Sequence, residues 1–124
     1  MQRIRRLLIA NRGEIVSRVA RTARSMGIET AGIFAEPDRG LPFVRDVDVA
    51  IALPGTTPAE TYLNIERVLD AARRAGADAV HPGYGFLSEN PTFARAVMDA
   101  GLVWVGPTPE AIAAMGDKVA ALER

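Results

Sequence analysis

Short apolar runs alternate with amphipathic stretches along the chain, and this alternation restricts the fold more than any other feature of the sequence. The apolar runs are expected as strands near residues 6–10, 30–35, 48–53, 79–81 and 102–105. Between the runs, apolar residues recur at helical spacing. Strands that alternate with helices are typical of βαβ units, whose strands are parallel. The sequence therefore predicts an α/β fold: an open, Rossmann-like sheet of five parallel strands with helices on both faces.

Residues that favour helix ends mark several boundaries. Asn90 and Thr108 are each followed by a proline, a combination that favours a cap and a first helical residue. Another helix is expected to be introduced by Pro58 and Thr61 and to end at Gly76.

The last stretch predicts a boundary inside the chain. Gly116 is expected to end a short helix over residues 109–115, and Asp117 to cap a further helix over residues 118–124. That helix has no stop signal, so the chain is expected to be the front of a longer protein. Residues 1–116 are expected to form one domain, and residues 117–124 to begin the connection to the next.

Composition excludes several classes of function. The chain has 124 residues, of which 48% are hydrophobic and 24% charged, as in an ordinary globular domain. Its formal net charge is zero, so no general field attracts nucleic acid or an anionic membrane. No apolar stretch approaches the ~20 residues of a membrane span. We expect a cytoplasmic protein that binds neither nucleic acid nor membrane.

Ligand sites of open parallel sheets lie beyond the carboxyl ends of the strands, here the loops after the first and fourth strands. Residues 11–14 (NRGE) hold one glycine where a dinucleotide-binding turn needs three, which favours a tight turn without a ligand even though Glu36 stands where a ribose carboxylate would. Residues 83–88 (GYGFLS) come closer to that pattern. This loop could hold an anion through backbone N–H groups, or make an aromatic contact through Tyr84.

Catalytic and metal-binding patterns do not emerge from the residues alone. His81 is the only histidine, and no carboxylate spacing joins it to Ser88 in a triad. A structural role for His81 is favoured, and no catalytic or metal-ligating residue is predicted. Arg18, Arg21 and Arg24 form a basic stripe on the first expected helix, either a solvated face or a subunit contact.

The chain resembles the biotin carboxylase family in a series of segments. They are residues 9–15 (IANRGEI), 38–39 (DR), 62–64 (YLN), 81–90 (HPGYGFLSEN), 106–107 (GP) and 115–118 (MGDK). The ten-residue block at 81–90 is the most specific of them. The sequence departs from the family at Phe43, where members commonly carry His, and at Val47–Val49, where they commonly carry Ala-Asp-Glu.

The resemblance implies the N-terminal domain that precedes an ATP-grasp fold. The implied enzyme is a ligase that uses ATP, Mg²⁺ and bicarbonate to carboxylate biotin on a carrier protein, that works with a carboxyltransferase component, and that forms a homodimer. Lys118 matches the family's ATP-binding lysine, Tyr84 and Gly85 match a loop near the biotin site, and Arg18 and Arg21 match the interface region. Most of the family's catalytic residues lie beyond residue 124, so these residues alone are expected to be inactive.

Two questions stay open at this point. The resemblance extends to carboxylases of acetyl-CoA, propionyl-CoA, other acyl-CoA thioesters, pyruvate and urea, so the final acceptor is not assigned. The alternative from another class of function is a stand-alone, non-catalytic α/β module that binds a nucleotide or a partner protein. An ATP-grasp region after Arg124 would decide for the enzyme.

Overall fold

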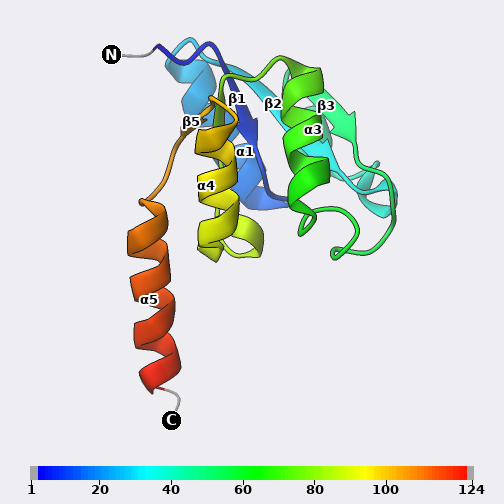
Figure 1. Cartoon of the computed structure of the whole chain (residues 1–124). Helices are drawn as coiled ribbons and strands as arrows, with labels where there is room; N and C mark the ends of the chain where they lie inside the picture. The colour runs from blue at the N-terminus through cyan, green and yellow to red at the C-terminus, as the bar shows by residue number, and fades with distance from the viewer. Residues whose placement is uncertain (1–2, 123–124) are drawn as a thin grey trace.

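A computed structural model, which describes residues 3–122, contains a five-stranded sheet (Figure 1). The strands are β1 (Arg6–Ile9), β2 (Glu29–Phe34), β3 (Val49–Ala52), β4 (Ala79–His81) and β5 (Val103–Trp104). All neighbouring pairs are parallel, in the order β3-β2-β1-β4-β5. The predicted sheet is confirmed, and each strand end lies within one residue of its expected position.

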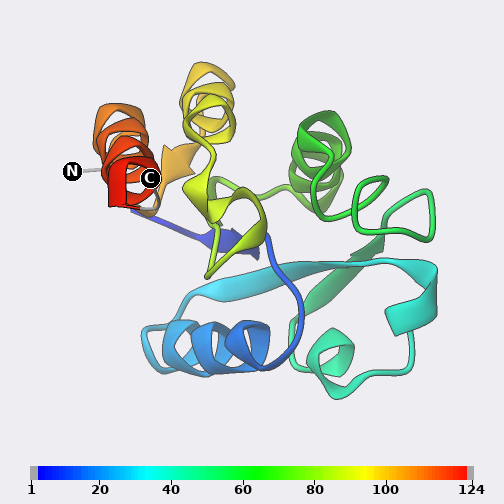
Figure 2. The ribbon, with the colours of Figure 1, turned by 90° about the horizontal axis from the view of Figure 1, so that it is seen from below.

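Helices cover both faces of the sheet, as the sequence predicts (Figure 2). They are α1 (Glu14–Ser25), α2 (Pro42–Arg45), α3 (Ile65–Ala75), α4 (Pro91–Asp99) and α5 (Pro109–Leu122), with 3₁₀ turns η1 (Glu36–Asp38) and η2 (Phe86–Glu89). The chain runs outward from β1 to β3, then crosses back to β4 and continues to β5. Because such crossovers are right-handed, α1 and α2 lie on one face, and α3 and α4 on the other.

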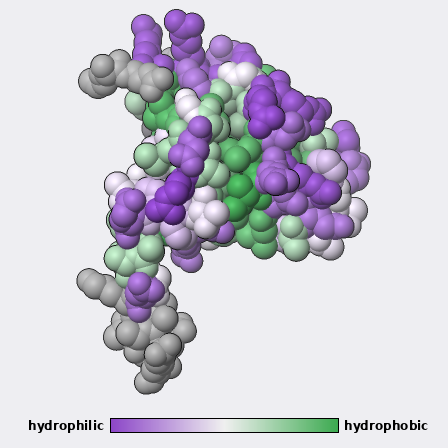
Figure 3. All heavy atoms as spheres, in the orientation of Figure 1, coloured by the Kyte–Doolittle hydropathy of each residue, from purple (hydrophilic) through white to green (hydrophobic). Residues whose placement is uncertain are grey.

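The hydrophobic core has one layer on each face of the sheet. Leu8 contributes to the layer beneath α3 and α4, whereas Leu7 and Ile9 contribute to the layer beneath α1, as the alternation of side chains along a strand requires. Phe93 of α4 is fully buried and meets Trp104 edge to face, with ring centroids 5.6 Å apart. Figure 3 shows a band of apolar surface between α4 and α3, flanked by hydrophilic side chains.

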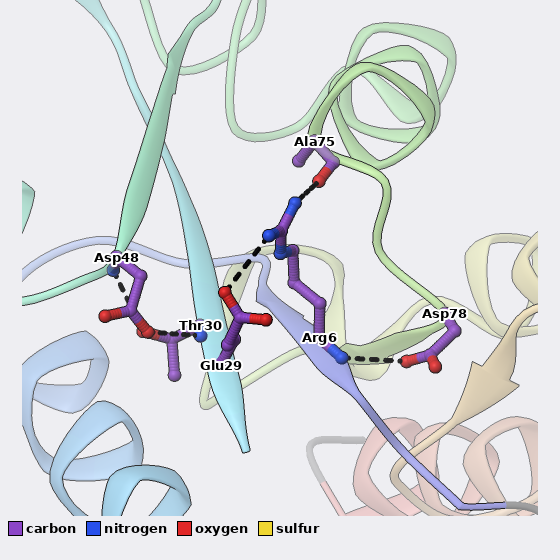
Figure 4. Close-up of polar contacts among 6 residues, drawn as sticks. All are labelled: Arg6, Glu29, Thr30, Asp48, Ala75 and Asp78. Carbon is purple, nitrogen blue, oxygen red and sulfur yellow. Dashed lines mark hydrogen bonds and ion pairs between the residues drawn. The ribbon is translucent and has the colours of Figure 1, made fainter. Parts of the chain in front are cut away.

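Polar contacts around Arg6 fix the amino-terminal edge of the sheet (Figure 4). Its guanidinium donates to the carbonyl oxygen of Ala75 at 2.6 Å, near the end of α3, and pairs with Glu29 at 3.1 Å. Its backbone N–H donates to the Asp78 carboxylate at 3.2 Å. These contacts join β1 to β2, to α3 and to the segment that enters β4.

Asp48 adds a second contact at this edge (Figure 4). Its carboxylate accepts from the backbone N–H of Thr30 at 2.8 Å, and its own N–H donates to the Thr30 hydroxyl at 3.1 Å. The hydrogen bond from the Thr30 backbone holds the pKa of Asp48 below its usual value. The pair fixes the segment before β3 against the start of β2.

The prediction for the start of α3 is wrong. The helix begins at Ile65, and Asn64 caps it by accepting from the N–H of Arg67 at 3.0 Å. Pro58 and Thr61 instead belong to a turn in which the Glu60 carboxylate accepts from the N–H groups of Thr56 and Thr57, both at 3.0 Å. These local bonds give the segment its own turn structure before the helix starts.

The predicted break at Gly116 is also wrong. α5 runs from Pro109 to Leu122 without interruption, so Asp117 is an interior residue and not a cap. A lone glycine costs a helix only about 1 kcal/mol relative to alanine, which its neighbours can offset. The predicted start is confirmed, because the Thr108 hydroxyl accepts from the N–H of Ala111 at 3.1 Å.

The predicted end of α3 at Gly76 and the predicted cap of α4 at Asn90 are confirmed. Asn90 accepts from the N–H groups of Thr92 and Phe93 at 2.9 and 3.2 Å, and Gly76 ends α3 in the left-handed conformation. Within residues 3–122, no helix combines the length and the apolar character that crossing a membrane requires.

Candidate functional site

The loops after β1 and β4 meet where the strand order reverses, and the side chain of Asn11 joins them. Asn11 follows β1 and is 2% exposed. Its Nδ2 donates to the carbonyl oxygens of Pro82 and Tyr84, both at 2.7 Å, and its Oδ1 accepts from the Arg12 N–H at 2.8 Å. Open α/β sheets commonly bind ligands in the crevice at this position. Here the Asn11 side chain lies buried between the two loops.

Gly83 allows this close approach. A Cβ at Gly83 would lie 2.7 Å from Asn11 Nδ2 and 3.0 Å from Asn11 Cγ, and the residue has a φ of +68°. Both observations favour glycine. On the other side of the crevice, the chain passes from β1 to α1 through Gly13. The structure thus has a strand-to-helix connection between Ile9 and Glu14, where the sequence predicts a turn.

The loop after β4 holds Tyr84 at the surface, with 75% of the residue exposed. Gly85 and Phe86 both have positive φ, of +64° and +49°, and Phe86 is the only non-glycine residue of the described chain with this conformation. A side chain makes positive φ unfavourable, so contacts elsewhere must hold Phe86 in place.

His81 makes a structural contact with this loop. Its Nδ1 accepts from the N–H of Gly83 at 3.0 Å, so the proton of the neutral ring is assigned to Nε2. Burial lowers the pKa of His81, which favours this neutral form. The structural role expected for His81 agrees with this geometry.

Arg12, Asp38 and Tyr62 form a network across the loops after β1, β2 and β3. Arg12 Nε and Nη2 donate to the Asp38 carboxylate at 2.8 and 3.0 Å. The Tyr62 hydroxyl donates to Asp38 at 2.7 Å and accepts from the N–H of Ala35 at 2.9 Å. The Tyr62 ring in turn lies 5.7 Å from that of Phe86. The network therefore reaches the loop after β4 that carries Tyr84, residues 82–86 (the Tyr84 loop).

The network also sets the ionisation of its members. The hydrogen bond from Arg12 holds the pKa of Asp38 below its usual value, so Asp38 is a carboxylate at neutral pH. Burial, with a smaller effect from the bond to Asp38, raises the pKa of Tyr62 to about 12, so its hydroxyl stays protonated and can donate.

Sequence reasoning missed Asn11, Asp38 and Tyr62 as members of one site. The sequence predicts ligand contacts only in the loops after the first and fourth strands, whereas Asp38 and Tyr62 follow the second and third strands. The available signal was the resemblance, because its segments at 38–39 and 62–64 contain Asp38 and Tyr62.

The structure gathers three of the predicted site residues around one cavity. α1 packs on β1 and β2, and α2 packs on β2, so the same face of β4 and β5 is less covered by helices. A cavity of about 670 Å³ lies beside α1, and its lining includes Arg18, Arg21, His81, Tyr84 and Val105. Arg18 and Arg21 are exposed. Gly85 adjoins Tyr84 but does not line the cavity.

The predicted ATP-binding residue lies elsewhere, on α5, which extends away from the sheet (Figure 1). A second cavity of about 350 Å³ lies between η2 and α5, lined by Ser88, Glu89, Pro107, Ala111, Ile112, Met115 and Gly116. Lys118 follows two residues later on the helix. Its backbone is helical, and its side chain falls outside the part of the chain whose side chains are described.

A magnesium site does not fit the described part of the chain. Mg²⁺ is held by carboxylates and other oxygen donors. Over residues 3–122, no group of three or more His, Cys, Asp or Glu side chains is placed to hold a metal ion.

Comparisons with known proteins identify relatives for nearly the whole chain. Residues 3–112 match the family model for "Biotin carboxylase, N-terminal domain". The chain is 55% identical over 119 residues to the biotin-dependent acyl-coenzyme A carboxylase alpha3 subunit of Mycobacterium leprae, covering 96% of the chain and 20% of that protein. It is 46% identical over 117 residues to a biotin carboxylase of Halalkalibacterium halodurans, covering 94% of the chain and 26% of that protein.

A solved structure supports the same relationship. The chain matches a complete multifunctional pyruvate carboxylase from Rhizobium etli with a TM-score of 0.90 and 39% identity, covering 98% of the chain and 13% of that protein. The chain thus spans about a quarter or less of the length of these relatives.

Proposed function

Because the chain belongs to the family of biotin carboxylase N-terminal domains, we propose that it presents the Tyr84 loop to biotin in an enzyme that carboxylates biotin with ATP and bicarbonate. The match of residues 3–112 to the family carries this proposal. The loop at residues 81–90 supports it, because it lies at the carboxyl edge of the sheet, where α/β folds place their ligands.

Tyr84 and Gly85 are the proposed contacts to biotin. Tyr84 is exposed and offers an aromatic face to a flat ring. A Cβ at Gly85 would have no atom within 4 Å, so a ligand can approach its backbone without meeting a side chain. We assign these residues a binding role and no proton transfer.

Lys118 is the proposed contact to ATP. An ammonium group on a flexible stem can approach a phosphate as a compact charge, whereas a guanidinium needs a planar partner and more room. In the proposed enzyme, α5 leads from this domain towards the ATP-binding region. Mg²⁺ would be held by residues outside the described part of the chain, because that part offers no suitable donor cluster.

The proposed partners follow from the same assignment. Carboxylated biotin is carried on a protein or domain, and a carboxyltransferase component passes the carboxyl group to the acceptor. The proposed enzyme is a homodimer with Arg18 and Arg21 at its interface. Residues 1–124 alone are proposed to be inactive.

Substitution of Lys118 tests the proposal in the complete protein that carries this chain. A charge-assisted hydrogen bond to phosphate contributes roughly 1.5–3 kcal/mol. Lys118→Ala is therefore expected to raise the KM for ATP, or lower kcat/KM, at least about tenfold. Lys118→Arg is expected to restore only part of the loss. The thermal midpoint should hardly change, because alanine favours a helix.

The assay measures bicarbonate-dependent ATP cleavage and its stimulation by free biotin. Wild-type protein without either activity would contradict the enzyme and favour the stand-alone binding module. Wild-type kinetics in Lys118→Ala would contradict the role of Lys118 alone.

A further inference from the structure

We infer that Asn11 is a positioning residue for biotin recognition, because its side chain holds the Tyr84–Gly85 loop in the conformation that exposes Tyr84. The inference rests on the proposed function, which makes that loop the contact to biotin. It assigns Asn11 no contact with biotin.

Asn11 provides the side-chain hydrogen bonds that connect the backbone of residues 82–85 to the rest of the domain. Its Nδ2 donates to the carbonyl oxygens of Pro82 and Tyr84, both at 2.7 Å. In the described chain, no other side-chain hydrogen bond reaches the backbone of residues 82–85 from beyond the β4–η2 segment. The bond from Gly83 to His81 and the bond from Ser88 to Gly85 are local to that segment.

The backbone of the loop needs such support. Gly83, Gly85 and Phe86 all have positive φ, and Phe86 carries a side chain that disfavours it. Tyr84 is 75% exposed, so packing contributes little to holding its side chain. Without the two bonds from Asn11, we expect the loop to sample other conformations.

Asparagine suits this position because all of its polar groups are used. Both hydrogens of Nδ2 have a carbonyl acceptor, and Oδ1 accepts from the N–H of Arg12 at 2.8 Å. An aspartate of the same shape would bring an oxygen against two carbonyl oxygens. Gly83 completes the fit, since a Cβ there would meet Nδ2 at 2.7 Å.

The positioning role of Asn11 concerns the Tyr84 loop and not the hydrophobic core. Asn11 contacts the loop through its backbone, and the exposed Tyr84 side chain depends on that backbone for its direction. Misplacing a binding group by about 1 Å can lower a rate by about a hundredfold. Loss of Asn11 should therefore affect biotin more than ATP, whose proposed contact lies on α5.

The test compares Asn11→Ala with wild type in the complete protein, with free biotin as the varied substrate. We expect the KM for biotin to rise at least about tenfold, while the KM for ATP changes less than about twofold. Hydrogen–deuterium exchange without substrates should become faster at the N–H groups of Gly83 and Ser88, which are hydrogen-bonded within this segment, and stay unchanged in β2 and β3.

Asn64→Ala is the matched control, because Asn64 caps α3 and does not contact the loop. It should lower the thermal midpoint and leave the KM for biotin unchanged. If Asn11→Ala is insoluble, Asn11→Asp is measured in its place, since it keeps the shape and removes the Nδ2 donor.

The outcomes separate the two proposals. Wild-type protein that biotin does not stimulate would overturn the proposed function. Stimulated wild-type protein together with an unchanged KM for biotin in the Asn11 variant would overturn the positioning role alone. An equal rise in both KM values, or unchanged exchange at Gly83 and Ser88, would also overturn it.

Discussion

His81 joins the end of β4 to the loop that carries Tyr84, and its ionisation provides a test of that contact. Burial lowers the pKa of His81 in the folded protein. The unfolded chain, with a histidine pKa of about 6.5, then binds the proton more tightly than the folded one. The resulting contribution to stability is complete above about pH 6.5 and is lost as the pH falls through the lower, folded pKa.

We expect the urea midpoint of the purified protein to fall between pH 7.5 and pH 5.5. Asp38, Asp48 and Glu60 also have lowered pKa values, with Glu60 at about 2. Their contributions are lost only as the pH falls below about 5, because unfolded carboxyl groups titrate near pH 4. The window from pH 7.5 to pH 5.5 therefore reports on the histidine.

His81→Asn is the control for this measurement. The asparagine oxygen can accept from the N–H of Gly83 as Nδ1 does, but it does not titrate. The variant should show a nearly constant urea midpoint across the same window. An equal fall in both proteins would contradict the assignment to His81.

Single residues were predictable where their partners are close in sequence. Asn90 and Thr108 cap helices through N–H groups two or three residues away, so local sequence identifies them. Asn11 contacts Pro82 across 71 positions, and Tyr62 contacts Asp38 across 24. Such pairs arise only when parallel strands bring their ends together, which local patterns do not encode.

At the scale of elements, α5 offers a direct test of how a glycine acts inside a helix. Gly116 lies in the interior of α5, and a Cβ there would have no atom within 4 Å. Gly116→Ala should therefore stabilise the protein by up to about 1 kcal/mol, because alanine has the higher helix propensity. Urea denaturation measures the change.

Gly101 is the matched control, because a Cβ there also meets nothing within 4 Å but the residue has a φ of +81°. Gly101→Ala should destabilise the protein by roughly 1 kcal/mol, since alanine disfavours that conformation. Destabilisation by both substitutions would contradict a continuous α5.

Elements with a strong apolar period were predictable, and their exact ends were less so. Short continuous apolar runs located all five strands. Two predictions were wrong, the helix break at Gly116 and the helix start at Pro58, and each relied too strongly on a single residue. In one case the helix tolerates the glycine, and in the other a carboxylate at Glu60 stabilises a turn that delays the helix.

At the scale of the whole molecule, the face of β4 and β5 that helices cover less is relevant to the proposed dimer. Arg18 and Arg21 are exposed on α1 and line the cavity beside β4 and β5. If this face contributes to the proposed dimer, Arg21→Glu should shift the complete protein towards monomer in sedimentation velocity. An effect on association, and not on folding, is expected because Arg21 is exposed.

Arg74→Glu is the control, because Arg74 is also exposed but lies on α3, on the opposite face of the sheet. It should leave the sedimentation profile unchanged. A profile that is unchanged by Arg21→Glu, or changed equally by both substitutions, would contradict the role of α1.

The fold class was predictable because periodicity reports which residues are buried. The spatial order of the strands was not part of the prediction, since it depends on which apolar edges pair and on where the chain reverses. That reversal brings the β1 and β4 loops together, and so the contact between Asn11 and the Tyr84 loop lay beyond sequence reasoning.

Residues at the two ends of the parallel strands differ in how freely they can be substituted. At the amino-terminal edge, Arg6, Asp48 and Asp78 already have their partners inside the domain, so most changes there would be removed by loss of folding. Tyr84 projects into solvent and can vary with little penalty to the core. A mutant library meant to retune ligand preference should therefore diversify the Tyr84 end and leave the Arg6 end intact.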